Sequence, residues 1–153
     1  VGRVSFRCGK LEQAGFHALR MTLPSGRILN YPLARLQWVD KKFPDGGTSK
    51  MEEIQFWGPH KTKAIWGWQS TYGGRLAENL VQAIGGDFMI SGVLAAEKAG
   101  YPAFATIHDQ ALCIKEEGMT ADGFREALCT LPPWAEGFPL EATAGEVPFY
   151  TKD

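Results

Sequence analysis

The chain has 153 residues, of which 44% are hydrophobic, 16 are Lys or Arg and 17 are Asp or Glu. This composition excludes a disordered, collagen-like or coiled-coil chain, and the length suits one globular domain with a proper core. The longest uninterrupted apolar run is well short of the roughly 18 residues that a membrane span requires, and no basic segment precedes an apolar one at the start. We therefore expect a soluble protein that is neither exported nor bound to a membrane.

Three cysteines, Cys8, Cys113 and Cys129, stand far apart and form no CxxC pair. An odd number of widely spaced cysteines favours buried thiols in a reducing compartment over a disulfide framework. Because the first residue is Val, we expect the chain to be a fragment of a longer protein.

The charges are distributed unevenly along the chain. Residues 1–75 contain 12 Lys and Arg against 5 Asp and Glu, whereas residues 76–153 contain 4 against 12. A basic half can attract a polyanion, and an acidic half can hold metal ions or simply keep the protein in solution. Charge alone favours two ordinary solvated surfaces.

The first half of the chain has the pattern of antiparallel strands. Apolar and polar residues alternate over 16–23 and 27–31, with turn residues Pro24-Ser25-Gly26 between them, which predicts a β-hairpin. A further strand is expected over 33–39, then a loop over 40–50 and another strand over 53–57. These strands predict a meandering antiparallel sheet.

A single long helix is predicted after Gly73-Gly74, because apolar residues recur at three- and four-residue steps from Leu76 to Ala95. Gly100-Tyr101-Pro102 should end it. The pair Gly85-Gly86 inside the helix costs about 1 kcal/mol per glycine relative to alanine, which indicates that something passes close to the backbone there.

The remaining elements are shorter. Strands are expected over 103–107 and 111–115 with His108-Asp109 as their turn, and a helix over 120–129 with Thr120 as its N-cap. Leu131-Pro132-Pro133 should end that helix, and 140–144 is expected to add an edge strand. The whole pattern predicts an α+β fold in which one long helix packs on an antiparallel sheet.

Two groups of residues are candidates for function on their types and spacing. His108-Asp109 interrupts two apolar strands, so a hairpin tip can present a carboxylate to a divalent cation. Spacing alone favours an ordinary turn, because Asp is a common turn residue. Arg75, Asn79 and Gln82 share one helix face, and such donors can test duplex geometry in the minor groove. Taken alone, the row favours an ordinary solvated helix face.

Tryptophans form a third candidate group. Aromatic residues beside basic ones can stack on unpaired bases, but tryptophans this dense more often have buried indoles in a core or an interface, which we favour here. The sequence contains no GxSxG motif, no recognisable cysteine nucleophile and no Cys/His metal cluster. The residues of this group are Trp57, Trp66 and Trp68, with Trp38 and Trp134 elsewhere and His60, Lys61 and Lys63 between them.

Four segments follow one another in a characteristic order: LPSGRILNY at 23–31, TYGGRLAENLVQAIGGD at 71–87, IHDQ at 107–110 and PPWAEGFPL at 132–140. Their order resembles the C-terminal part of family A DNA polymerases, the DNA polymerase I type, and especially phage-like members. The resemblance covers most of the chain from about residue 16, and four motifs in series are specific.

The resemblance implies that residues 1–153 form the C-terminal part of the palm subdomain, with His108, Asp109 and Gln110 as its motif C hairpin and catalytic residues. Asp109 would be one of two aspartates that hold two Mg²⁺ ions, which activate the primer 3′-hydroxyl and neutralise the triphosphate. His108 would lie against the primer-terminal phosphate.

The resemblance also implies binding partners. Gln82, Arg75 and Asn79 would contact the minor groove of primer-template DNA, and a dNTP would be the other substrate. The fingers, the first palm motif and the thumb would come from the missing remainder of the polymerase. The location would be the cytoplasm of a bacterial or phage-infected host cell.

The chain departs from the family pattern in three respects. Gln110 stands where the family has Glu, and an amide is a weak oxygen donor to a metal. In many members one more residue separates the Asn from the Gln, so Gln82 aligns better than Arg75 and Asn79. Nothing in the chain resembles the first palm motif or the fingers helix.

We therefore expect a chain that serves template-directed DNA synthesis as part of a larger polymerase and is inactive alone. The alternative is a stand-alone nucleic-acid-binding or assembly module without catalysis. A third interpretation, the metal dyad of a phosphohydrolase, requires further ligands, and only His17 and His60 remain besides His108.

Overall fold

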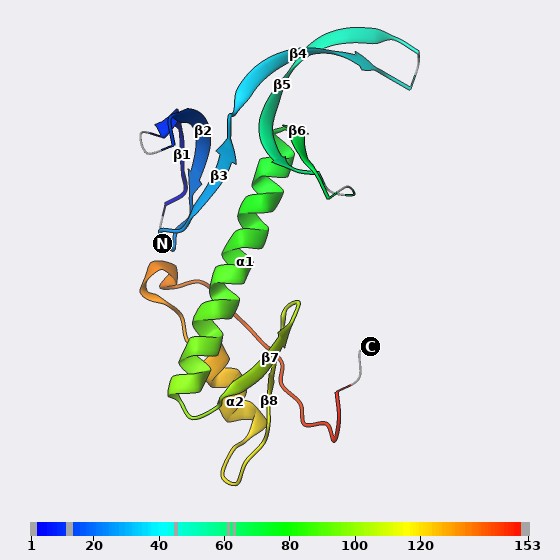
Figure 1. Cartoon of the computed structure of the whole chain (residues 1–153). Helices are drawn as coiled ribbons and strands as arrows, with labels where there is room; N and C mark the ends of the chain where they lie inside the picture. The colour runs from blue at the N-terminus through cyan, green and yellow to red at the C-terminus, as the bar shows by residue number, and fades with distance from the viewer. Residues whose placement is uncertain (1–2, 12–13, 45, 61, 63, 151–153) are drawn as a thin grey trace. The chain divides into compact units, whose positions relative to one another are not determined.

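The computed structural model describes residues 3–11, 14–44, 46–60, 62 and 64–150 (Figure 1). The chain divides into two compact units, and the division falls inside helix α1 (Gly73–Lys98). Arg3–Ala83 forms one unit, and the chain from Ile84 onward forms the other. Each unit has its own set of buried residues.

The first unit begins with a three-stranded antiparallel sheet. Its strands are β1 (Ser5–Leu11), β2 (Phe16–Thr22) and β3 (Ile28–Pro32), in the order β1-β2-β3. The turn after β2 is closed by the Leu23 amide donating to the Arg27 carbonyl at 2.8 Å, and Gly26 has a φ of 88° that favours glycine. The expected hairpin is confirmed. Strand β1 was not expected, because its side chains are mostly exposed and follow no apolar alternation.

A second three-stranded sheet follows, with β4 (Arg35–Lys42), β5 (Thr48–Pro59) and β6 (Trp66–Thr71) in the order β4-β5-β6. Strands β4 and β5 form a long curved hairpin (Figure 1). The expectation of a loop over 40–50 is wrong for most of its length, because Asp40 pairs with Lys50 and Lys42 with Thr48. Backbone pairing sustains these strands although their side chains are largely exposed, so no apolar pattern marks them. Strand β6 was not expected either.

Tyr31 joins the elements of the first unit. It is 6% exposed, and its ring packs edge-to-face on Phe56 of β5 at a centroid distance of 5.1 Å. Ala18 and Met21 of β2, with Leu23, are almost fully buried, and Leu76 of α1 is 7% exposed. Burial of these apolar groups holds the start of α1 against the strands that precede it.

Helix α1 confirms the expected long helix, and Gly100 follows it with a φ of 89°. By length and composition α1 could also cross a membrane, with a mean hydropathy of 1.3 over an 18-residue window that is 17% buried. The stretch is not uninterrupted, because it contains Asn79, Gln82 and Asp87. The length of the longest uninterrupted apolar run therefore does not reveal it. One such helix is weak evidence for a membrane span, because core helices pass the same test.

The second unit contains a two-stranded hairpin and a short helix. Strands β7 (Ala103–Ile107) and β8 (Gln110–Cys113) pair with each other, and α2 (Ala121–Leu128) precedes a 3₁₀ turn at Pro133–Ala135. Thr120 is the N-cap of α2, as expected, and its hydroxyl accepts from the Gly123 amide at 3.0 Å. The expected edge strand at 140–144 is wrong: within the described residues β7 and β8 pair only with each other, so the alternation there has no strand to join.

Close approach to the long helix occurs at Gly92 and not at Gly85-Gly86. A Cβ placed on Gly92 would lie 2.5 Å from the carbonyl oxygen of Leu128, at the end of α2. A Cβ on Gly85 or Gly86 would meet no described atom within 4 Å, so the expected cause for that pair is not found in the described chain. Only glycine lets the end of α2 lie so near the backbone of α1.

The C-terminal motif packs on the second half of α1. Trp134 and Phe138 both lie with ring centroids 4.8 Å from Phe88. Ala96 and Ala135 are also buried in this unit. The antiparallel strands and the long helix confirm the α+β class, although the strands form three separate sheets.

The prediction of tryptophans buried in the core of this chain is wrong for three of the five. Trp38, Trp66 and Trp68 are 61%, 62% and 42% exposed. Trp57 and Trp134 are half-buried. Lys61 and Lys63, which were grouped with these tryptophans, lie outside the described residues. The interpretation as a buried cluster fails because the β4-β5-β6 sheet leaves these indoles uncovered.

Candidate functional site

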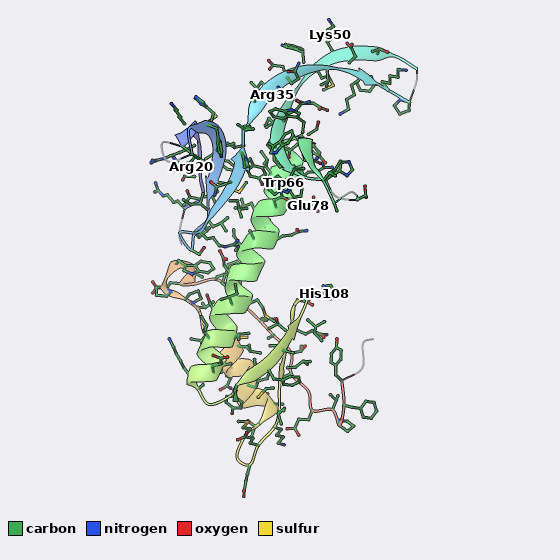
Figure 2. All side chains as sticks on the ribbon, in the orientation of Figure 1. Arg20, Arg35, Lys50, Trp66, Glu78 and His108 are labelled. Carbon is green, nitrogen blue, oxygen red and sulfur yellow. The ribbon has the colours of Figure 1, made fainter. Side chains whose placement is uncertain are left out.

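The tip of the β7-β8 hairpin presents three polar side chains. Ile107 pairs with Gln110, so His108 and Asp109 form a two-residue turn, and all three polar residues from His108 to Gln110 are exposed. His108 has a φ of 55°, in the left-handed region that few non-glycine residues adopt. Figure 2 shows His108 at the end of the hairpin. The hairpin therefore holds an imidazole and a carboxylate side by side at a strained, accessible turn.

Tyr150 contacts this tip and was missed by sequence analysis. Its hydroxyl donates to Oε1 of Gln110 at 3.2 Å. Glu146, four residues before Tyr150, forms an ion pair with Lys115, whose Nζ lies 2.7 Å from Oε2. This ion pair holds the C-terminal segment close to the residues that follow β8. No local pattern signals a contact between residues 40 positions apart, so only the structure reveals it.

The Tyr150 contact affects what Gln110 can do. When its oxygen accepts a hydrogen bond, the amide offers its two N–H donors outward. N–H donors suit an anionic oxygen and cannot ligate a cation. In this arrangement Tyr150 engages the amide oxygen of Gln110, and the two N–H donors of the amide are available to an acceptor.

A cavity of about 630 Å³ lies in the second unit beside the hairpin, and its lining comes from β8, the start of α2 and residues 144–150. Cys113 lines it, and burial, together with the negative charge of Glu116, raises the pKa of this thiol. A raised pKa keeps the thiol protonated, so Cys113 is a poor nucleophile at neutral pH. The cavity therefore offers apolar packing beside the hairpin, without a reactive cysteine.

The donor set for a metal ion is incomplete in the described chain. Among the described residues no group of three or more His, Cys, Asp or Glu side chains is placed to hold a metal. Asp109 contributes one accessible carboxylate, the ligand type that Mg²⁺ prefers.

The row on α1 is partly engaged with its own unit. Arg75 donates from Nη1 to the Ser70 carbonyl at 3.2 Å, and its guanidinium lies 5.6 Å from the centroid of the Tyr72 ring. Asn79 donates from Nδ2 to the hydroxyl of Tyr31 at 3.0 Å. Gln82 is exposed, and its side chain makes no hydrogen bond to any residue that the structure describes. Gln82 is therefore the member of the row whose amide is free to meet a ligand.

The two groups of site residues belong to different compact units. Arg75, Asn79 and Gln82 lie in the unit Arg3–Ala83, where steps of four and three residues place them on one helix face. His108, Asp109 and Gln110 lie together in the other unit. The structure thus forms each group separately, as the sequence spacing predicts.

Comparison with known proteins relates this chain to a phage DNA polymerase. The relative is the DNA polymerase of Bacillus phage SP02, which is 33% identical over 136 residues. The alignment covers 88% of this chain but only 20% of the relative, so the chain spans about one fifth of that protein's length. No family model matches the chain. No solved structure matches it either.

Proposed function

We propose that this chain is the C-terminal palm portion of a family A DNA polymerase and serves template-directed DNA synthesis within a larger enzyme. The similarity to the phage polymerase over nearly the whole chain supports this proposal most strongly. The order of the four sequence motifs supports the finer part of the proposal, namely family A and the palm subdomain. The substrates would be primer-template DNA and a dNTP.

In this proposal the α1 row contacts the duplex through its minor groove. Gln82 makes the direct contact, because an exposed amide can both donate to and accept from base edges. Asn79 and Arg75 already bond to Tyr31 and to Ser70, so they shape the surface and offer their remaining donors.

The hairpin supplies the catalytic groups in the proposed enzyme. Asp109 would hold Mg²⁺ together with a carboxylate from the missing first palm motif. Bound there, Mg²⁺ would supply Lewis-acid stabilisation of the negative charge on the reacting phosphates. His108 would donate to the primer-terminal phosphate, and Gln110, fixed by Tyr150, would offer N–H donors beside it.

The isolated chain should incorporate no nucleotide. It carries one accessible aspartate at the hairpin, and no described residues complete a metal site. The test is extension of a labelled primer on a template with the purified 153-residue chain, Mg²⁺ and dNTPs. Extension above the level of a protein-free control would contradict the assignment of half an active site to this chain.

The variant Gln82→Ala should weaken binding of the chain to a primer-template duplex by about fivefold, which corresponds to one hydrogen bond of about 1 kcal/mol. Alanine has a higher helix propensity than glutamine, so the loss would not come from helix unfolding. The measurement is fluorescence anisotropy over a salt series, in which phosphate contacts should make the affinity fall steeply with salt.

The matched control is Val81→Ala, because Val81 is 68% exposed and lies beside the row but not on it. This variant should change the affinity by less than about twofold. Equal losses for the two variants, or no saturable duplex binding at low salt, would remove the basis for the α1 row as a DNA-binding surface.

A further inference from the structure

One face of the β4-β5-β6 sheet gathers aromatic and cationic side chains. In the antiparallel register Arg35 pairs with Gln55, Gln55 with Ser70, and Trp57 with Trp68, and directly paired residues point to the same face. Since side chains alternate along each strand, Trp66 lies on this face too. We call the set Arg35, Trp57, Trp66 and Trp68 the tryptophan face; Figure 2 labels Arg35 on β4 and Trp66 on β6.

The rings of the tryptophan face are ordered against one another and open to solvent. The guanidinium of Arg35 lies 3.6 Å above the centroid of the Trp68 ring, and Nη2 donates to Oε1 of Gln55 at 3.1 Å. Trp57 and Trp68 pack edge-to-face at 5.6 Å. Trp66 remains 62% exposed at the end of this series. The contacts with Arg35 and Trp57 fix the plane of the Trp68 ring, and part of the apolar surface of these indoles remains exposed to solvent.

We propose that the tryptophan face binds an unpaired DNA strand, whose bases stack on Trp66 while Arg35, held over the Trp68 ring, meets the phosphates. Every base has a π-face, so aromatic platforms beside cations bind single strands with little sequence preference. In a duplex the bases already stack on one another, so their faces are not available to these rings. This surface goes beyond the proposed function, which concerns the paired primer-template.

Charge favours a nucleic acid as the occupant over an apolar protein segment. The first 75 residues carry 12 Lys and Arg against 5 Asp and Glu, so this part of the chain attracts a polyanion. One opposing charge lies on this face, the carboxylate of Glu53, which accepts from the Ser70 hydroxyl at 2.7 Å. The guanidinium held over Trp68 can donate hydrogen bonds to a phosphate backbone, whereas an apolar segment has no acceptor for them.

The chain contains a matched control for this face. Trp38 is 61% exposed, almost the same as Trp66, and it belongs to the same sheet. Trp38 pairs with Glu52. Along β4, Trp38 is an odd number of residues from Arg35, and side chains alternate between the two faces of a sheet, so the Trp38 indole lies on the face opposite the tryptophan face. Substitution of Trp38 removes an equally exposed indole without touching the proposed surface.

The experiment uses the complete chain and a fluorescein-labelled 15-nucleotide oligo-dT, with anisotropy measured at low salt. Trp66→Ala should weaken binding about tenfold and Trp66→Phe only slightly, because phenylalanine retains a stacking ring. Trp38→Ala should change the affinity by less than about twofold. A blunt duplex of the same length should show no difference between Trp66→Ala and the unsubstituted chain.

Equal effects of Trp38→Ala and Trp66→Ala, absence of oligo-dT binding, or the same loss with the blunt duplex would overturn the proposal. Because Trp66 is largely exposed, its replacement should leave the circular dichroism spectrum unchanged. Failure here is distinguishable from failure of the proposed function, since the latter is read from Gln82→Ala on the paired primer-template.

Discussion

Substitution Asp109→Asn is expected to lower nucleotide incorporation by at least about a hundredfold when this chain replaces the matching fifth of the SP02 phage polymerase. Asn retains the size of Asp but removes the negative charge that would hold Mg²⁺. Metal stabilisation of transition-state charge is worth several kcal/mol, and each 1.4 kcal/mol is about a factor of ten in rate. Asp109 is exposed at a turn, so the substitution should not disturb the fold. The measurement is single-turnover primer extension.

The control for this substitution is Asp122→Asn in α2. Asp122 is an exposed carboxylate in the same unit, and it forms an ion pair of 3.4 Å with Arg125, one helical turn away. We expect incorporation within about twofold of the unsubstituted chimera. Similar activity for Asp109→Asn and Asp122→Asn would argue against a catalytic role for the hairpin. Duplex binding measured in parallel separates a loss of chemistry from a loss of DNA affinity.

The variant Gly92→Ala is expected to destabilise the second unit by about 1–3 kcal/mol, the usual cost of overpacking. Its new methyl group would lie 2.5 Å from the carbonyl oxygen of Leu128, and a backbone atom cannot rotate away as a side chain can. Helix α1 or α2 must therefore shift. The measurement is urea denaturation followed by circular dichroism, in which the midpoint should fall.

The comparison that isolates this clash is Gly86→Ala, in the same helix. A Cβ at Gly86 would meet no described atom within 4 Å, so only the helix propensity changes, and we expect stabilisation by about 1 kcal/mol. The two substitutions are chemically identical and should have opposite signs. If Gly92→Ala also stabilises the chain, α1 and α2 are not in the close contact that the structure describes.

Local sequence patterns were sufficient for several elements. Alternation of apolar and polar residues predicts the β2-β3 hairpin, and a periodicity of three and four residues predicts helix α1. The N-cap of α2 is predicted by Thr120, whose hydroxyl can accept a hydrogen bond from a backbone amide in the first turn. The turn at His108-Asp109 was also predicted, because two apolar strands flank a polar pair. Each of these signals lies within one or two turns of the chain.

Other elements left no local pattern to read. Strand β1 and the distal part of the β4-β5 hairpin expose most of their side chains, so backbone pairing and not burial holds them in place. An apolar alternation at 140–144 conversely predicted a strand that has no partner in the described chain. Pairing is a property of two segments, which the pattern of one segment cannot contain.

The sequence by itself determined the α+β class, the composition of the His108-Asp109 turn and the shared helix face of Arg75, Asn79 and Gln82, because these depend on residue spacing along one element. Only the tertiary structure decided that Asn79 bonds to Tyr31, that Tyr150 bonds to Gln110 and that Trp66 stays uncovered. Those features depend on which distant segments meet, and contacts between distant segments arise only when the chain folds.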